Sequence, residues 1–135
     1  MRLKKNELHQ LARQIIQTLP KGGIILLVGD LAAGKTTLVQ TFAAYQGIED
    51  AVTSPTFSLQ QCYGNKLFHY DIYNHGLDHF LALGLLEELE RSGYHFIEWG
   101  DDALLKLLRH AGLDVIQITI EKCADDARCY EVEHA

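Results

Sequence analysis

The sequence predicts an α/β sandwich of three layers, in which helices cover a mostly parallel sheet that includes an antiparallel hairpin. Three observations support this class. A buried strand, a glycine-rich loop and a helix follow one another over residues 23–47. Two alternating segments flank a turn at residues 64–65, and helix and strand patterns alternate after residue 77. A chain of 135 residues supports one core, so a single domain over residues 1–135 is expected.

The N-terminal part is predicted to form a helix and then a buried strand. An apolar stripe with helical spacing follows Asn6, the expected N-cap, and ends at Leu19 before Pro20. Residues 23–28 form a continuous apolar run, which is typical of a strand buried on both faces. The helical pattern after the loop ends near Gly47.

The second half alternates strands and helices. Residues 57–63 and 67–73 are predicted to pair as a hairpin. Residues 77–92 indicate one or two leucine-rich helices, residues 94–98 a short strand and residues 101–111 a further helix. The remaining strands are predicted at residues 115–120 and, at an edge of the sheet, residues 130–132.

The loop after the first buried strand is the predicted phosphate-binding site. Residues 29–36, Gly-Asp-Leu-Ala-Ala-Gly-Lys-Thr, match the G-x-x-x-x-G-K-[ST] pattern of P-loop nucleotide hydrolases and kinases. The glycines let backbone N–H groups point at phosphate oxygens, Lys35 brings a positive charge, and the Thr36 hydroxyl can ligate Mg²⁺. The start of the helix adds the positive end of its dipole. The predicted nucleotide-binding residues of the loop are Asp30, Leu31, Ala32, Ala33, Gly34, Lys35, Thr36 and Thr37.

A P-loop also needs acids that handle the metal ion and water, and these are expected at the C-terminal ends of strands. Asp71 and Glu98 are each a lone carboxylate at the end of an apolar strand. Both are candidate catalytic residues with Lys35, and candidate metal ligands with Thr36. Thr53 and Thr56 flank Pro55 in the segment where P-loop switches sense the γ-phosphate.

Other nucleotide-binding and metal-binding classes fit less well. A GTPase would need N-K-x-D, but residues 65–68 place Phe where Asp is required. A nucleotide kinase would need an arginine-rich lid, and the arginines beyond the loop are isolated. His75 and His79 are four residues apart without an H-E-x-x-H pattern, which makes a solvated helix face the better interpretation.

Composition and charge indicate a globular protein with an acidic body. The chain is 47% hydrophobic and 22% charged, and no apolar run is long enough to span a membrane. Residues 1–21 carry a net charge of +4 and the rest −10, which argues against wide direct contact with nucleic acid. The three scattered cysteines fit a reducing cytoplasm better than a disulfide framework, so a cytoplasmic location is expected.

Four segments, taken in order, resemble the TsaE (formerly YjeE) ATPases, bacterial proteins required to make threonylcarbamoyladenosine in tRNA. The segments are residues 29–37 (Gly-Asp-Leu-Ala-Ala-Gly-Lys-Thr-Thr), 52–57 (Val-Thr-Ser-Pro-Thr-Phe), 69–73 (His-Tyr-Asp-Ile-Tyr) and 96–100 (Phe-Ile-Glu-Trp-Gly). Together they are much more specific than the loop alone. The likeness also departs from the family pattern at Ala32 in place of a glycine, at Asn74 in place of an arginine and at the acidic pair of residues 101–102.

The resemblance implies a role for each matched residue. Lys35 would hold the phosphates, and Thr36 and Asp71 would help to place Mg²⁺. Glu98 would be the metal-associated or water-activating acid, with Trp99 beside the site. The switch-like segment near the γ-phosphate would consist of Thr53, Ser54 and Thr56. The implied cofactors are ATP and Mg²⁺, and the implied partners are TsaD and TsaB, with tRNA contacted mainly indirectly.

The resulting hypothesis is a Mg²⁺-dependent ATPase whose hydrolysis serves a tRNA-modifying complex. No arginine finger is evident, so we expect slow hydrolysis by the chain alone and faster turnover with its partners. Two alternatives stay open: a nucleotide-dependent protein-binding module in which hydrolysis is incidental, and a small-molecule kinase. Adenine is not distinguished from guanine, because no base-reading motif is visible.

Overall fold

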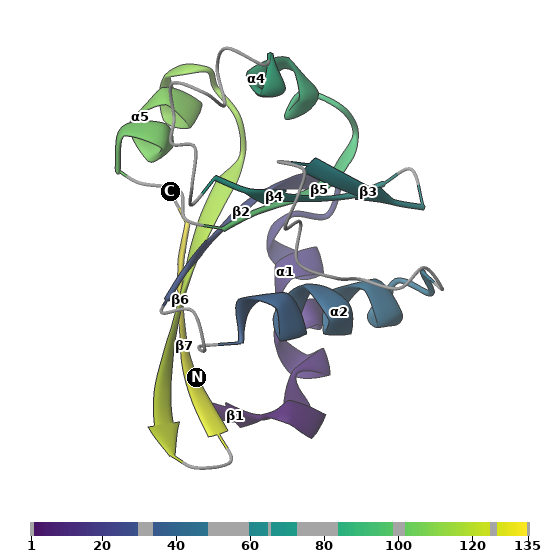
Figure 1. Cartoon of the computed structure of the whole chain (residues 1–135), viewed down its shortest axis with the longest axis vertical. Helices are drawn as coiled ribbons and strands as arrows, with labels where there is room; N and C mark the ends of the chain where they lie inside the picture. Colours follow the sequence, from purple (N-terminus) through teal and green to yellow (C-terminus); the bar gives the residue numbers. More distant parts are fainter. Residues whose placement is uncertain are drawn as a thin grey trace.

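The computed structural model describes residues 2–29, 34–48, 60–64, 66–72, 84–98, 102–124 and 127–134. These residues form a seven-stranded mixed sheet with helices on both faces (Figure 1). The strands are β1 (Arg2–Lys4), β2 (Gly22–Val28), β3 (Gln60–Tyr63), β4 (Leu67–Asp71), β5 (Gly93–Glu98), β6 (Val115–Ala124) and β7 (Ala127–His134). The helices are η1 (Lys5–Glu7, a 3₁₀ turn), α1 (His9–Thr18), α2 (Lys35–Tyr45), α4 (Leu85–Glu88) and α5 (Asp102–His110).

The sheet has the order β1-β7-β6-β2-β5-β4-β3, with parallel strands in the middle and antiparallel strands at both edges. Strands β6, β2, β5 and β4 are parallel neighbours, and β3 pairs antiparallel with β4. The predicted fold class and its hairpin are confirmed. The sheet has more antiparallel pairing than that one hairpin, because β7 pairs with β6 and β1 pairs with β7. The predicted edge strand at residues 130–132 therefore lies one position inside the edge and extends over the whole of β7.

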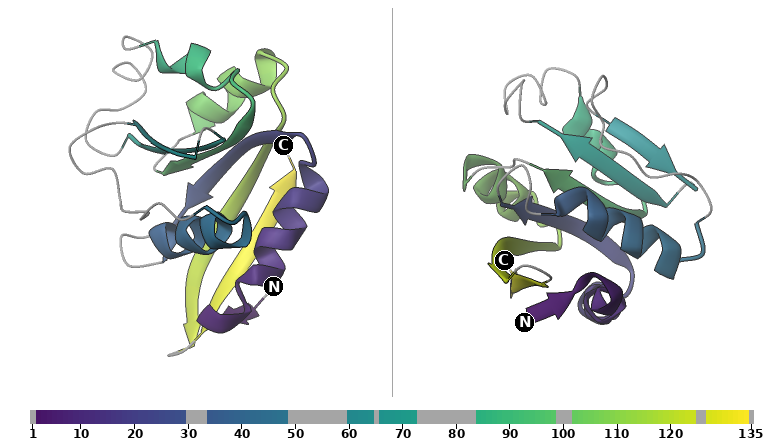
Figure 2. Two further views of the ribbon diagram at one scale, coloured as in Figure 1. Left: turned by 90° about the vertical axis from the view of Figure 1, so that its right-hand side faces the viewer. Right: turned by 60° about the horizontal axis from the view of Figure 1, so that its bottom comes forward.

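The two faces of the sheet have separate cores, which follow from the alternation of β2. Ile25 and Leu27 belong to a core with residues of α1 and α2, whereas Ile24 and Leu26 belong to a second core with Leu104 and Leu108 of α5. Figure 2 shows α1 and α2 on one side of the sheet and α4 and α5 on the other. Because β2 is apolar on both faces, it is suited to the centre of the sheet, where its end leads into the predicted phosphate loop.

The structure contradicts the predicted start of the first helix and confirms the predicted end of the last one. The N-cap predicted at Asn6 is wrong, because residues 5–7 form a 3₁₀ turn and α1 begins at His9. The turn is closed by Glu7, whose carboxylate accepts a hydrogen bond from the Lys4 backbone N–H at 2.9 Å. Gly112 lies just past the end of α5 with φ +74°, in agreement with the predicted stop.

The expectation that all three cysteines are free thiols is wrong for one pair. Cys123 and Cys129 form a disulfide across the β6–β7 hairpin, with a Cα–Cα distance of 5.8 Å, and Cys62 is free and exposed. Cys129 is the register partner of Glu121, and Cys123 lies at a register shift between Lys122 and Ala124, an irregularity that spacing along the sequence does not reveal. Within the described ranges, no helix is long and apolar enough to cross a membrane.

Candidate functional site

The start of α2 presents backbone N–H groups at the end of the predicted phosphate loop. Gly34 caps the helix with φ +103°, and no side chain caps it. The first helical hydrogen bond runs from the Leu38 N–H to the Gly34 carbonyl at 3.1 Å. The N–H groups of Lys35, Thr36 and Thr37 precede this bond, so they have no acceptor within the helix. This end of α2 is electropositive and suited to an anion.

Lys35 directs its ammonium group toward the residue that follows β2. The side chain is only 3% exposed, and its Nζ donates a hydrogen bond to the Gly29 carbonyl oxygen at 2.8 Å. Gly29 directly follows β2, and Lys35 is the first residue of α2. Their hydrogen bond therefore joins the two ends of the loop. A buried cation costs free energy unless anionic or dipolar groups surround it, and a phosphate chain would supply such charge.

Asp71 and Glu98 end two neighbouring strands at the same level of the sheet. They are register partners in the parallel pair β4–β5, and Glu98 is also the partner of Leu27 in β2. Leu27 lies two residues before Gly29, so both carboxylates lie at the edge of the sheet from which the loop departs. The predicted placement of both acids at strand ends is confirmed. Glu98 is 4% exposed, and Asp71 is half-buried.

The site faces the helix layer that contains α2. Glu98 is on the same side of β5 as Phe96, whose ring packs edge-on against Phe42 of α2 at 5.0 Å between centroids. Asp71 and His69 alternate in the same way on β4, and His69 is the register partner of Phe96. His69 is fully buried, and its Nε2 makes a hydrogen bond with Oε2 of Glu98.

Sequence reasoning missed His69 as a site residue. Its signal is its spacing: two positions before Asp71 on the same strand, it must share that residue's face of the sheet. Because His-Tyr-Asp was interpreted as part of an apolar strand, only its terminal acid was assigned chemistry.

A second histidine, His95, belongs to a network on the opposite face. Its Nε2 donates to the Arg91 carbonyl at 2.8 Å, and its Nδ1 accepts from the Tyr70 hydroxyl at 2.8 Å. The same hydroxyl accepts from Gln60 Nε2 at 3.2 Å. Burial lowers the pKa of His95 and raises the pKa of Tyr70, so both groups are held neutral. Both ring nitrogens of His95 and the Tyr70 hydroxyl have hydrogen-bond partners, as expected for structural support.

Several predicted site residues lie outside the described residues. They are Asp30, Leu31, Ala32 and Ala33 of the loop, Thr53, Ser54 and Thr56 of the switch-like segment, and Trp99. Their roles, including the strain expected at Ala32, stay predictions. His75 and His79 lie outside the described residues as well.

The described residues offer oxygen donors for a magnesium ion. In this part of the chain, no group of three or more His, Cys, Asp or Glu side chains could hold a metal ion by itself. Asp71 and Glu98 supply two carboxylates, and Thr36 at the start of α2 supplies a hydroxyl. Mg²⁺ commonly takes one or two carboxylates and completes its shell with phosphate oxygens and water. The donor set therefore fits this ion once a nucleotide is bound.

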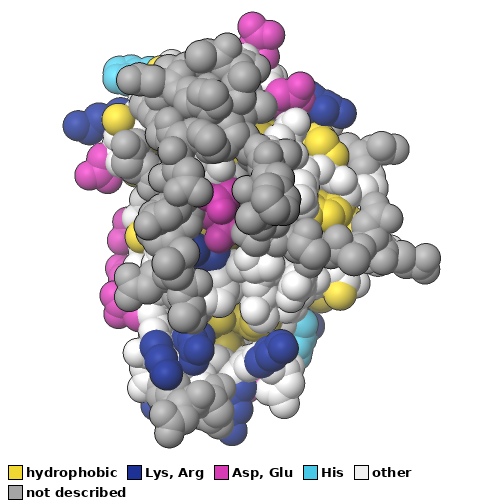
Figure 3. Space-filling view, in the orientation of Figure 1, with side chains coloured by type: hydrophobic (Ala, Val, Ile, Leu, Met, Phe, Trp, Pro, Cys, Tyr) yellow, Lys and Arg dark blue, Asp and Glu magenta, His cyan; other side chains and the backbone are white. Residues whose placement is uncertain are grey.

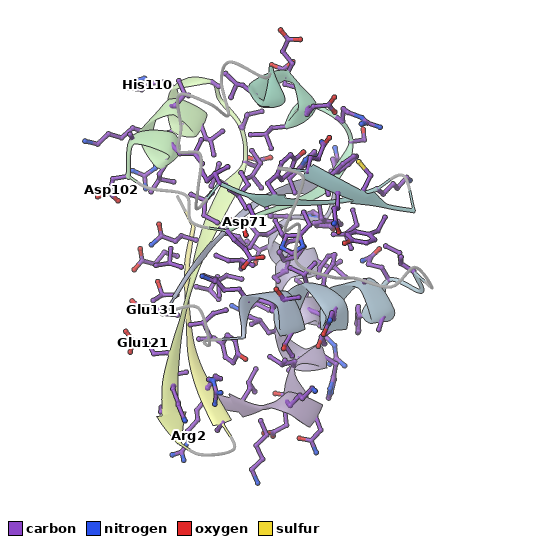
Figure 4. All side chains as sticks on the ribbon, in the orientation of Figure 1. Arg2, Asp71, Asp102, His110, Glu121 and Glu131 are labelled. Atoms are coloured by element: carbon purple, nitrogen blue, oxygen red, sulfur yellow. A yellow bond between two sulfur atoms is a disulfide. The ribbon has the colours of Figure 1, made fainter. Side chains whose placement is uncertain are left out.

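Acidic and basic side chains lie next to one another near the centre of the molecular surface in the view of Figure 3. Figure 3 shows acidic atoms directly above basic atoms in a central position between segments drawn in grey. Figure 4 places Asp71 in the same central area above α2, whereas Arg2, Asp102, His110, Glu121 and Glu131 lie at the periphery. Acidic residues of the periphery therefore provide controls for substitutions at the centre.

The fold and this site define a class of protein: an α/β fold of the P-loop NTPase type. A solved structure supports the class, since the crystal structure of Bacillus subtilis YdiB aligns with the whole chain at a TM-score of 0.69 and 27% identity, over 84% of YdiB. A family model described as threonylcarbamoyl adenosine biosynthesis protein TsaE matches residues 3–130. The chain belongs to the TsaE family.

Curated relatives agree over most of the chain. The tRNA threonylcarbamoyladenosine biosynthesis protein TsaE of Treponema pallidum is 34% identical, over 82% of this chain and 81% of the relative. The protein of the same name from Streptomyces coelicolor is 32% identical, over 94% and 86% respectively. That from Bacillus subtilis is 36% identical, over 79% and 66%. The family resemblance of the four sequence segments is therefore confirmed.

Proposed function

We propose that the chain is an ATPase that supports the threonylcarbamoyladenosine modification of tRNA. One observation supports this proposal most strongly. The buried ammonium group of Lys35 and the carboxylates of Asp71 and Glu98 come from three different elements and lie at the same edge of the sheet. A cation beside a helix start binds phosphates, and paired acids at neighbouring strand ends handle a metal ion and water. Because the chain belongs to the TsaE family, we infer that this chemistry serves tRNA modification.

In the proposed mechanism, water attacks the γ-phosphate in line and ADP leaves. Lys35 binds the β- and γ-phosphate oxygens, and the N–H groups at the start of α2 orient the phosphate chain. Glu98 would orient the attacking water or complete the shell of the metal ion, which Asp71 and Thr36 would hold. Bound Mg²⁺ supplies neutralisation of the charge that develops on the phosphate oxygens. Most of the acceleration then comes from positioning and electrostatics.

The proposed setting is a cytoplasmic complex with proteins of the TsaD and TsaB types. Lys35, Asp71 and Glu98 supply one cation and two acids, and no arginine is among these residues. We therefore expect slow hydrolysis by the chain alone and acceleration when TsaD and TsaB complete or order the site. The acidic character of the chain supports a mainly indirect relation to tRNA.

The test combines hydrolysis with tRNA modification. ATP turnover is measured with and without TsaD and TsaB, for the natural chain and for Glu98→Gln, with Glu131→Gln as the peripheral control (Figure 4). We expect stimulation by the partners, and we expect Glu98→Gln to lose both turnover and modified tRNA while it still binds ATP. Intact modification in Glu98→Gln would instead support the nucleotide-dependent binding module. Equal rates with and without partners would refute partner dependence.

A further inference from the structure

We propose that His69 is a positioning residue that fixes the carboxylate of Glu98 at the phosphate loop; this inference rests on the proposed function. The contact joins Nε2 of His69 on β4 to Oε2 of Glu98 on β5. The two strands are parallel neighbours, and His69 is level with Phe96, one same-face position below Glu98. The imidazole thus lies beneath the acid, on the side of the sheet that carries α2.

The environment of the pair restricts how it can bond. His69 is 0% and Glu98 is 4% exposed, so bulk water does not supply alternative partners for the ring. In the proposed arrangement, Nε2 of His69 is the donor and the carboxylate oxygen of Glu98 is the acceptor. The contact uses Oε2 and leaves the other carboxylate oxygen of Glu98 for water or a metal ion. An outer-shell histidine of this kind sets the orientation of the acid that does the chemistry.

An unsatisfied atom separates this histidine from an ordinary core residue. Nδ1 of His69 is buried and has no hydrogen-bond partner within the described residues. An apolar side chain level with Phe96 would fill the same volume without that cost. His95 provides the internal comparison, because both of its nitrogens are satisfied. Within the described residues, the hydrogen bond to Glu98 is the polar contact that offsets the burial of the His69 ring.

Three substitutions separate a positioning role from a space-filling role. In His69→Gln, the amide nitrogen can occupy the place of Nε2 and donate to Glu98. In His69→Asn, the shorter side chain places its amide near Nδ1 and cannot make the contact. His69→Leu fills the core without a donor. Asn and Gln are both buried amides, so a difference between them reports the contact and not the polarity of the site.

We expect His69→Leu and His69→Asn to lower kcat for ATP by about 10- to 100-fold, with the KM for ATP nearly unchanged. His69→Gln should recover most of this loss. When Glu98→Gln is combined with His69→Leu, the double variant should be no slower than Glu98→Gln alone, because His69 acts through the acid. Equal rates for His69→Asn and His69→Gln, or additive losses in the double variant, would overturn the proposal.

A measurement on the free protein tests the contact without any turnover. In nitrogen-15 spectra of the imidazole rings, His69 should carry its proton on Nε2, and this proton should exchange slowly with solvent. Glu98→Gln should shift its resonance, whereas Glu131→Gln should leave it in place. A proton found on Nδ1 instead would remove the donor and refute the inference. Failure of the natural chain to hydrolyse ATP with its partners would refute the proposed function separately, since the ring signal does not depend on it.

Discussion

Lys35 is deeply buried, and its Nζ donates a hydrogen bond to the carbonyl oxygen of Gly29 at 2.8 Å. A neutral carbonyl stabilises an ammonium group less than phosphate oxygens do, because charge-assisted hydrogen bonds are roughly twice as strong as neutral ones. Under the proposed function, phosphate oxygens would therefore hold this ammonium group more strongly than the Gly29 carbonyl does.

Substitution of Lys35 should weaken nucleotide binding while the fold persists. We expect Lys35→Gln to bind ATP roughly 10- to 100-fold more weakly, since one hydrogen bond to a charged group contributes about 1.5–3 kcal/mol. Titration calorimetry measures the affinity. Lys106→Gln on the exposed face of α5 is the matched control and should bind as the natural chain does. Equal affinities for the two variants would exclude Lys35 from the phosphate site.

His95 makes stability depend on pH. Burial lowers its pKa in the folded state, and the nearby Arg91 guanidinium lowers it further, whereas its hydrogen bond to the Arg91 carbonyl and the Glu88 carboxylate act in the opposite direction. Below about pH 6.5, the ordinary value for histidine, the unfolded chain binds the proton more readily than the folded one. The stability that neutral His95 contributes is thus present above pH 6.5 and lost as the pH falls.

Unfolding measured by urea between pH 7.5 and pH 5 checks this effect. The free energy of unfolding of the natural chain should fall by up to about 1.4 kcal/mol per pH unit through this group. His95→Gln should show a shallower decline, because the amide does not titrate. Parallel curves for the two proteins would assign the pH dependence to other groups.

At the scale of the elements, the start of β5 fixes the register on which the site depends. An added Cβ at Gly93 would meet the Lys66 carbonyl oxygen of the neighbouring strand connection at 2.4 Å, and one at Gly22 would meet the Gly93 carbonyl oxygen at 2.4 Å. Both glycines have positive φ. The close approach brings β5 level with β2 and β4, and a slip of one residue would turn Glu98 to the opposite face of the sheet.

Gly93→Ala should be much more destabilising than a glycine substitution in open space. We expect a loss of about 3 kcal/mol, from the backbone clash together with φ +131°. The control is Gly112→Ala, which has φ +74° and no atom within 4 Å of the added Cβ, and should cost about 1 kcal/mol. Thermal or urea unfolding gives both values. Similar losses at the two positions would show that the contact with Lys66 does not constrain β5.

The strands and acids of the site were largely predictable from the sequence, whereas the contact of His69 with Glu98 was not. A run apolar on both faces predicted β2 in the sheet centre, and lone acids after apolar runs predicted Asp71 and Glu98 at one edge. Strand β1 escaped prediction because Arg2–Lys4 contains one apolar residue and forms only by pairing with β7. The role of His69 escaped because it depends on the register between β4 and β5, which no local pattern of residues contains.

At the scale of the whole molecule, the C-terminal hairpin extends away from the site. Its last pairing with β2 is at Thr119, and the disulfide of Cys123 and Cys129 lies beyond this position. Reduction should lower the free energy of unfolding by at most about 2 kcal/mol, since the bridge closes a short loop. Nucleotide affinity should not change, because Lys35, Asp71 and Glu98 belong to other strands and to α2.

The measurement is urea unfolding with and without a reductant, compared with a Cys123→Ser, Cys129→Ser double variant. The double variant should match the reduced natural chain and should not respond to reductant. Alkylation and mass spectrometry of the untreated protein should find Cys62 as the free thiol. Three alkylated cysteines in unreduced protein would contradict the pairing.

The central position of β2 also determines when the molecule can fold. Its two neighbours in the sheet are β5 and β6, which begin at Gly93 and Val115, far along the chain from Gly22. During synthesis on the ribosome, the phosphate loop emerges long before either neighbour exists. Pairing across such separations is slow, because loop closure precedes any gain from contact. The end of β2 therefore meets its β5 neighbour only after β5 has been made, and the same pairing places Glu98 level with Leu27.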